Sequence, residues 1–372
     1  MSEYQYYEFQ AADRPLTPAD RQALRSLSSR ATITATSFTN EYNFGDFRGD
    51  PVKLMQTWFD LHAYVANWGS RRLMIRLPAR LLDRPFVDHI GDAADCLTVI
   101  EAGDNFILDI RRNDEEGGES VEDGPGWLAS LAPLRADLLG GDSRVLYLLW
   151  LMAVEAEGIE PDEPEPLPGI GPMTDALEAF VNFFGIDPDL AAAAAERVSM
   201  EQIAPGAAQA VIAAMDGPGK NALLLRLFES DPLAAADLRA AVRQGQPGAP
   251  QAARRTAAEL LARAEVQREE REAAEARKSA EQRRLADERA RKEERARRDA
   301  LIRRGEAVWR EIEADIETSS AKGYTAAASL LSEMREIAEE RGQTVDFARR
   351  LVAIRERHER KKQFLIRIRG LE

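Results

Sequence analysis

The chain has 372 residues, with 44% hydrophobic residues and 64 acidic against 50 basic side chains. This length exceeds one ordinary hydrophobic core and indicates two or three folded units, while the net charge of −14 argues against a general nucleic-acid-binding protein. A single cysteine, Cys96, excludes an intrachain disulfide and a thiolate metal cluster.

The first residues lack the basic-then-apolar pattern of a signal peptide, and no stretch approaches the roughly 18 apolar residues of a membrane helix. We therefore expect a cytoplasmic protein that does not contact the membrane.

The first third of the chain mixes strand and helix patterns. Strand formers over residues 3–9 predict a first strand, and the Thr17-Pro18-Ala19-Asp20 start predicts a helix to about residue 28. A β-branched stretch over 31–38 predicts a second strand. Asp50-Pro51 is expected to open a helix, whose buried face would carry Leu54, Trp58, Leu61 and Val65.

Residues 72–77 predict a strand with alternate apolar side chains inward, and residues 97–101 and 105–110 flank Ala102-Gly103-Asp104 as a hairpin. Helices over 127–139 and 143–157 would close the unit. The N-terminal domain is thus predicted to be α+β, with a small, mostly antiparallel sheet.

Residues 158–172 hold five prolines and four acids, which is typical of an extended linker. Helical spacing broken by proline and glycine predicts a helical subdomain over 173–244, followed by a second linker at 245–250.

The proline-free run from 251 to 318 predicts a helix of about 100 Å. Between Gln267 and Asp299, Leu285 is the only large aliphatic residue, so the helix is polar all round. Local pairs of an acid four residues before a base are expected to support it: Asp287–Arg291, Glu288–Lys292, Glu293–Arg297 and Glu294–Arg298. Its alanine-rich seam is weak for a coiled coil, and the oligomeric state stays open.

Three apolar stripes beyond this helix predict an antiparallel three-helix bundle, with turns at Gly323 and Gly342. The third helix is expected to outrun its neighbours, so its tip would overhang and bind a partner. The predicted contact residues are Phe364, Leu365, Ile366, Arg367, Ile368 and Arg369.

Residues 349–369 carry nine bases and two acids. This patch could attract phosphate, but docking on an acidic surface, of a partner protein or of this chain, is the simpler account and a partner protein is favoured. The nucleic-acid contacts would be Arg349, Arg350, Arg357, Arg360, Lys361 and Lys362.

Other constellations favour structural roles. Asp216-Gly217-Pro218-Gly219-Lys220-Asn221 lacks the spacing and the final hydroxyl of a phosphate-binding loop. The three histidines, His62, His89 and His358, share no metal-ligand spacing, and the acids over 114–123 lack the calcium-loop pattern. Trp68-Gly69-Ser70-Arg71-Arg72 suggests stacking on a base, but a turn before a strand is the favoured interpretation.

Three stretches together carry a resemblance: Tyr4 to Phe9 with Asp13 to Thr17, Asn43 to Asp46, and Tyr64 to Gly69. They resemble a family of uncharacterised bacterial proteins that begin Ser-Glu-Tyr-Gln-Tyr-Tyr-Glu-Phe. The resemblance implies a bacterial, cytoplasmic origin and assigns no residue roles.

We therefore predict a non-enzymatic interaction or scaffold protein without a cofactor or metal, which spaces a folded head from a helical tip that binds another protein. The alternative is an accessory subunit that binds nucleic acid through the basic C-terminal helix. The predicted parts are a head (1–157), a linker (158–172), a helical subdomain (173–244), a linker (245–250), a charged helix (251–300) and a bundle (301–372).

Overall fold

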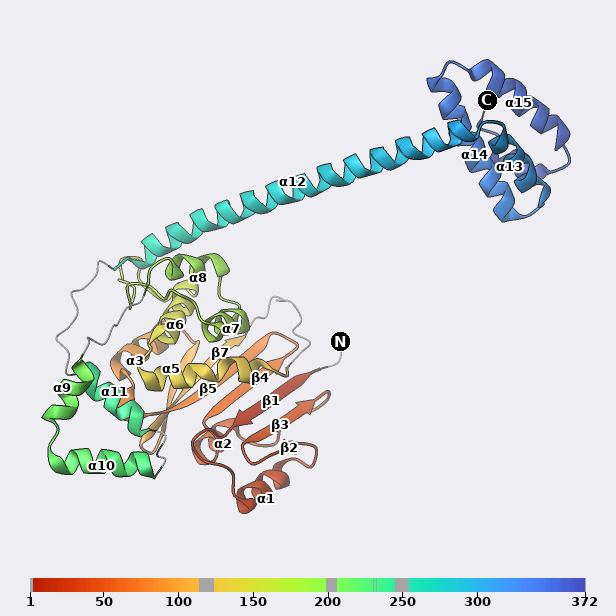
Figure 1. Cartoon of the computed structure of the whole chain (residues 1–372). Coiled ribbons are helices and arrows are strands. Elements are labelled where there is room, and N and C mark those ends of the chain that lie inside the picture. The colour runs from red at the N-terminus through yellow and green to blue at the C-terminus, as the bar shows by residue number, and fades with distance from the viewer. Residues whose placement is uncertain are drawn as a thin grey trace. The chain divides into compact units, whose positions relative to one another are not determined.

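The computed structural model describes residues 3–113, 124–198, 206–229, 231, 233–244 and 254–371. The chain divides into two compact units, Met1–Arg271 and Glu272–Glu372. The N-terminal unit contains a seven-stranded antiparallel sheet, and helices follow it (Figure 1). The predicted α+β fold with an antiparallel sheet is confirmed.

The strands lie in the order β2-β3-β1-β4-β5-β7-β6. Their bounds are β1 Gln5–Gln10, β2 Thr32–Ile33, β3 Ser37–Tyr42, β4 Leu61–Ala66, β5 Ser70–Pro78, β6 Leu97–Ala102 and β7 Asn105–Asn113. The predicted hairpin is confirmed, since Glu101 pairs with Phe106 around a turn in which Gly103 has a φ of +64°.

Alternation along the strands builds two cores, one on each face of the sheet. Leu73, Ile75 and Leu77 of β5 point to the first face and are buried, as predicted. Met74, between them, points to the second face and packs with Phe9 and Phe38 in a separate cluster.

Helices α1 and α2 cover part of the second face. Helix α1 (Pro18–Leu27) begins with a capping box between Thr17 and Asp20 and buries Leu24. Helix α2 (Pro51–Thr57) is capped by Asp50, whose carboxylate accepts from two backbone N–H groups, and it buries Leu54 and Met55.

The helices on the first face surround α6, in which all residues from Val145 to Val154 are buried. The helices of this side are η1 Ala79–Leu81, α3 Arg84–Ala93, α4 Trp127–Leu131, α5 Pro133–Gly140, α6 Arg144–Glu155, α7 Asp175–Phe184 and α8 Pro188–Ala195.

Two predicted elements of the sheet are wrong. Residues 31–38 are not one strand, because the chain turns between β2 and β3, which pair with each other. Leu61 and Val65 belong to strand β4 rather than to the end of a helix, because β4 is hydrogen-bonded between β1 and β5. Their spacing of four residues also fits one face of a strand, so periodicity alone could not separate the two structures.

The proline-rich segment 158–172 packs onto the N-terminal unit. Ile159 and Ile170 are buried in the first-face core, which also contains residues of α7 and α8. Glu165, fully buried, accepts hydrogen bonds from the Tyr147 hydroxyl and from the Arg255 guanidinium. The second predicted linker, 245–250, lies outside the described residues.

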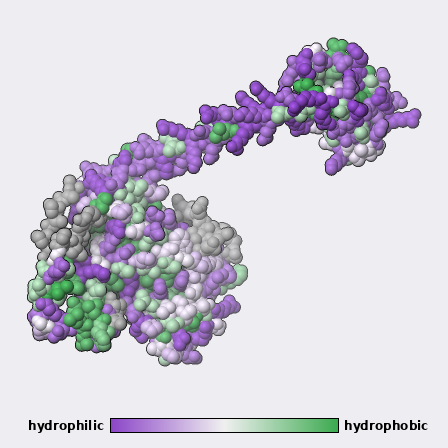
Figure 2. Space-filling view, viewed as in Figure 1, coloured by the Kyte–Doolittle hydropathy of each residue, from purple (hydrophilic) through white to green (hydrophobic). Residues whose placement is uncertain are grey.

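Three further helices belong to this unit: α9 Ala207–Ala214, α10 Gly217–Phe228 and α11 Ala234–Gln244. Every residue of α10 is exposed or half-buried, and Phe228 is 85% exposed. Figure 2 shows the apolar side chains gathered over α10.

Helix α12 (Ala257–Arg304) is continuous over 48 residues, or about 72 Å at about 1.5 Å per residue. It is shorter than the predicted run because Gly305, at a φ of +50°, separates it from the next helix. Every residue from 269 to 297 is exposed, and Figure 2 shows hydrophilic side chains along the helix. Of the predicted pairs, Glu294–Arg298 closes at 2.6 Å.

The C-terminal unit consists of helices α13 Glu306–Glu317, α14 Ala321–Glu340, α15 Thr344–Arg357 and α16 Lys362–Arg367. The predicted apolar faces of the first three form its core, which includes Val308, Leu331 and Leu351.

The expectation that the C-terminal tip overhangs the bundle is wrong. The third predicted helix ends at Arg357, and the chain turns so that α16 packs against α14. Phe364 and Ile368 are fully buried in the C-terminal core, since this turn lets them cover Tyr324 and its neighbours.

Candidate functional site

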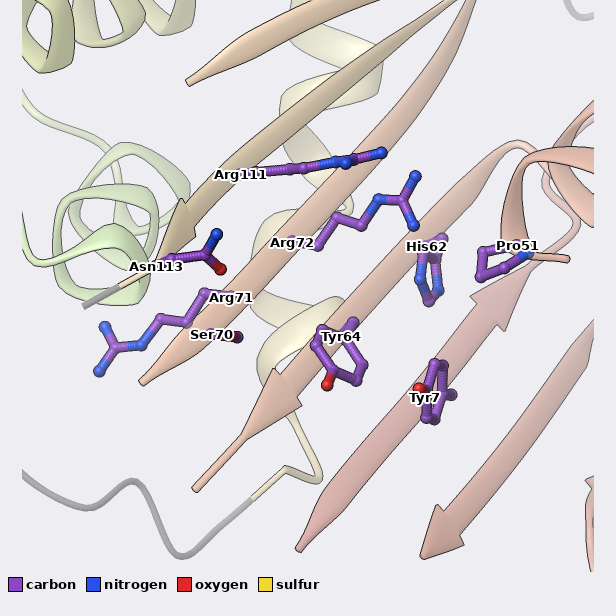
Figure 3. Close-up of a pocket in the computed structure, with 9 residues that line it drawn as sticks. All are labelled: Tyr7, Pro51, His62, Tyr64, Ser70, Arg71, Arg72, Arg111 and Asn113. Atoms are coloured by element: carbon purple, nitrogen blue, oxygen red, sulfur yellow. The ribbon is translucent and has the colours of Figure 1, made fainter. Parts of the chain in front are cut away.

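A pocket of about 240 Å³ lies on the second face of the sheet (Figure 3). Alternate residues of β1, β4, β5 and β7 reach this face, and Pro51 at the start of α2 borders it. The lining residues are Tyr7, Pro51, His62, Tyr64, Ser70, Arg71, Arg72, Arg111 and Asn113. The pocket thus combines aromatic rings with the guanidinium groups of Arg72 and Arg111.

Two of these arginines share one buried carboxylate. Asp109 is 0% exposed, and it accepts hydrogen bonds from Arg72 Nε at 2.7 Å and Nη2 at 2.8 Å. Arg111 Nη2, two residues along β7, donates to the same carboxylate at 2.6 Å. Burial by itself raises the pKa of Asp109, but the hydrogen bonds from both arginines outweigh it and hold that pKa below its usual value.

The arginine cluster itself carries a net positive charge, since two cations face one anion, and the Asp46 carboxylate lies on the tyrosine side of the pocket. The Arg111 side chain is 49% exposed, whereas that of Arg72 is 16% exposed. Each guanidinium has five N–H donors, and only some of them bind Asp109. The arrangement can bind an anion with donors whose directions are already fixed.

His62 is a buried, neutral base in the pocket wall. Its Nδ1 lies 2.9 Å from the Glu8 carbonyl oxygen, which can only accept, so Nδ1 carries the hydrogen and Nε2 is an acceptor. Burial lowers the pKa of His62 to about 3. The ring stacks on Phe9 at 3.9 Å between centroids, and Nε2 has no hydrogen-bond partner within the described part of the chain.

Gln5 fixes the two tyrosines. Its Oε1 accepts from the Tyr7 hydroxyl at 2.7 Å and from the Tyr64 hydroxyl at 3.2 Å. The two rings lie 4.7 Å apart between centroids. Burial and the neighbouring tyrosine raise the pKa of Tyr7, so both rings stay neutral. They form a rigid aromatic surface next to the arginines.

The Trp68 to Arg72 stretch is a turn followed by strand β5, as the favoured interpretation predicted, and it also contributes to the pocket. Ser70, Arg71 and Arg72 all line the pocket, and Trp68 is 46% exposed on the turn before β5. Arg71 points away from the other lining residues in Figure 3, and its Nη1 donates to the Asn182 carbonyl oxygen at 3.1 Å.

Sequence reasoning missed Asp109, Arg111 and the role of His62. The pairing of Arg72 with Arg111 and of Phe9 with His62 sets them together across the sheet. The alternation of Leu108, Asp109, Ile110 and Arg111 was the available signal, because it puts both charged residues on one face of a strand.

The predicted partner-binding tip is largely built into the C-terminal unit. Phe364 and Ile368 are buried and Leu365 is half-buried, so these side chains serve the core. Ile366 is 64% exposed, and Arg367 and Arg369 are exposed as well.

Most of the predicted nucleic-acid contacts have acidic or backbone partners in the C-terminal unit. Arg350 pairs with Glu306 at 2.6 Å and lies over the Trp309 ring, and Arg357 pairs with Glu313. The remaining predicted contacts include Arg349, which pairs with Asp346, Lys361, which donates to the Ile316 carbonyl oxygen, and the exposed Arg360 and Lys362. These ion pairs reduce the positive charge that a phosphate would meet.

The other constellations have structural partners. Asp216 caps α10 by accepting from the Gly219 N–H at 2.8 Å, so this stretch is a helix start. His89 contacts Glu163 at 3.0 Å, and His358 contacts Glu313 at 2.6 Å. The acidic stretch 114–123 lies outside the described residues. Within the described ranges, no group of three or more His, Cys, Asp or Glu side chains is placed to hold a metal ion.

A groove of about 540 Å³ runs between α13 and α15 of the C-terminal unit. Trp309 and Ile354 supply its apolar surface, and its charged rim includes Arg310, Glu317 and Arg357. Both helices pack on α14, and the groove is the hollow that they leave beside each other.

Over the residues that the structure describes, no helix is both long and apolar enough to cross a membrane. No protein-family model, curated protein or solved structure matches this chain, so its own geometry carries the functional argument.

Proposed function

We propose that this chain is a non-enzymatic interaction protein of the cytoplasm, in which α12 spaces the N-terminal unit from a C-terminal unit that binds another protein. The observation that carries the proposal is the uniform exposure of residues 269–297 in one unbroken helix. A helix that is polar all round gains no stability from a core and suits a bridging role.

The two units have separate hydrophobic cores, and this supports a spacer role for α12. Ala257, Leu260 and Ala264, at the start of α12, belong to the first-face core. Leu301, near its end, belongs to the C-terminal core. Each end of the helix is thereby fixed to one unit.

The groove between α13 and α15 is the partner site that we propose in place of the buried tip. Its length along two helices and its apolar floor at Trp309 and Ile354 suit an amphipathic helix of another protein. Its rim carries both signs of charge, which favours a partner helix with a mixed charged edge over a polyanion.

Crosslinking of the full chain in its own cells, followed by mass spectrometry, tests the partner site. We expect protein crosslinks at α13 and α15 that are lost in Arg310→Glu, on the groove rim, and kept in Arg303→Glu, an exposed residue of α12. Crosslinks to nucleic acid that disappear with salt would instead support the alternative of binding through the basic C-terminal helix.

Spin labels test the spacer. In a Cys96→Ala background, labels at Glu272 and Arg295 should give one narrow distance near 35 Å, because 23 residues of helix rise about 1.5 Å each. A broad distribution would show that the middle of α12 does not hold a fixed length in solution, and the spacer proposal would fail.

A further inference from the structure

We propose that the pocket on the second face of the sheet binds a small planar ligand that carries one phosphate group, the chemistry of a nucleoside monophosphate. This site is separate from the groove of the C-terminal unit, so it extends the function beyond protein binding. The inference rests on two features of the pocket: its cations and its rings.

The cations define the charged end of the ligand. Asp109 orients Arg72 and Arg111 through hydrogen bonds of 2.6 to 2.8 Å, so neither side chain has to be ordered when a ligand arrives. The remaining N–H donors and the net positive charge of the cluster match a phosphate, which accepts several hydrogen bonds at once.

The rings define the planar end. Tyr7 and Tyr64 cannot rotate freely, because Gln5 holds both hydroxyl groups. Their exposed surface lies within the same pocket as the guanidinium groups. A heterocycle can stack on such a surface without any sequence-specific contact.

Rings and cations together distinguish a nucleotide from a simple anion. His62 forms part of the pocket wall and is fully buried, so it shapes the pocket without presenting a polar atom to a ligand. Inorganic phosphate cannot bring a ring to Tyr7 and Tyr64, and an uncharged ring cannot bring an anion to the arginines.

The pocket size sets the scale of the ligand. A volume of about 240 Å³ is below the usual range for drug-sized ligands of roughly 300–1,000 Å³. It accommodates a ring or a sugar phosphate, with the rest of a mononucleotide reaching over the pocket rim.

Calorimetric titration of the full chain with uridine monophosphate, uridine and inorganic phosphate tests the proposal. We expect the monophosphate to bind at least tenfold more tightly than either fragment. Equal affinity for inorganic phosphate, or no heat with the monophosphate at millimolar concentration, would overturn it.

Neighbouring arginines of β7 provide a matched pair of variants. Arg111→Met removes a pocket cation while Asp109 keeps its two bonds to Arg72, and it should weaken nucleotide binding at least tenfold. Arg112→Met removes a cation that pairs with Glu155, and it should change binding less than twofold. Equal losses in both variants would contradict the assignment.

Two substitutions of Tyr64 separate a loss of stacking from a folding defect. Tyr64→Phe keeps the ring and should bind within threefold of the wild type, whereas Tyr64→Leu should lose at least fivefold. Retention of full affinity by Tyr64→Leu would rule out stacking at this position.

Discussion

Mild acidification should weaken the N-terminal unit through a single side chain, His62. The unfolded chain takes up a proton at this residue near pH 6.5, but burial lowers the pKa of His62 in the folded protein to about 3. The stabilising effect is therefore complete above about pH 6.5 and is lost progressively as the pH falls towards 3.

The expected magnitude follows from that difference. Each pKa unit corresponds to about 1.36 kcal/mol, so lowering the pH from 7 to 5 should remove about 2 kcal/mol from the free energy of unfolding through His62. The variant His62→Asn keeps a donor near the Glu8 carbonyl oxygen but cannot take up a proton, so it should not show this component.

Hydrogen exchange of the β1 and β4 peptides, measured in the full chain at increasing urea concentration, gives this free energy for the correct unit. The wild type should lose about 2 kcal/mol more than His62→Asn between pH 7 and pH 5. Equal pH dependence in the wild type and His62→Asn would refute the reasoning.

Three further predictions concern stability. Asp109→Asn should destabilise the N-terminal unit by about 3–5 kcal/mol in urea unfolding, because it leaves two arginines without their buried anion; a loss below about 1 kcal/mol would contradict this. Phe364→Ala should lower the stability of the C-terminal unit by about 3–5 kcal/mol, and Ile366→Ala should lower it by less than about 0.5 kcal/mol. Hydrogen exchange of α14 peptides measures both values. A larger loss in Ile366→Ala than in Phe364→Ala would contradict the burial of Phe364 and support the overhanging tip. Phe228→Ser should change stability by less than about 0.5 kcal/mol while reducing the binding of an apolar dye, and unchanged dye binding would show that α10 is covered in solution.

Local signals in the sequence predicted the elements that local forces determine. Thr17 and Asp20 form the capping box that their spacing indicates, and β5 alternates as Leu73 and Ile75 require. Strand β4 was missed because its identity depends on hydrogen bonds to β1 and β5, which are distant in sequence. Spacing within ten residues carries no information about such partners.

The packing of the proline-rich segment, residues 158–172, also depends on contacts with residues that are distant in sequence. Its composition is that of a linker, yet Glu165 binds Arg255 at 2.9 Å across 90 residues of sequence. This buried ion pair, together with Ile159 and Ile170 in the first-face core, holds the segment against the N-terminal unit. Neither the acid nor the base is distinguishable in sequence from its exposed neighbours.

Only part of the candidate site could be predicted from the sequence, and the reason is physical. Arg72 was singled out because it lies next to Trp68, whereas Asp109 and Arg111 meet it only through the antiparallel register of β5 and β7. Positive charge in the basic C-terminal helix was fully visible, but Glu306 and Glu313, some forty residues away, neutralise part of it. Charge in a sequence is a sum, whereas binding depends on which charges are left after folding.

The ends of α12 limit how the helix can respond to force. Near its start, Arg268 bonds to Asp187 at 2.5 Å and Arg271 to Asp189 at 2.9 Å. Near its end, Arg298 reaches Glu336 at 3.3 Å.

Because core residues and ion pairs fix both ends within their own units, bending at either end would break several contacts at once. We therefore expect bending of the helix to concentrate in residues 272–296, none of which belongs to either core. Substitutions there should alter the label-to-label distance distribution while leaving the stability of both units unchanged.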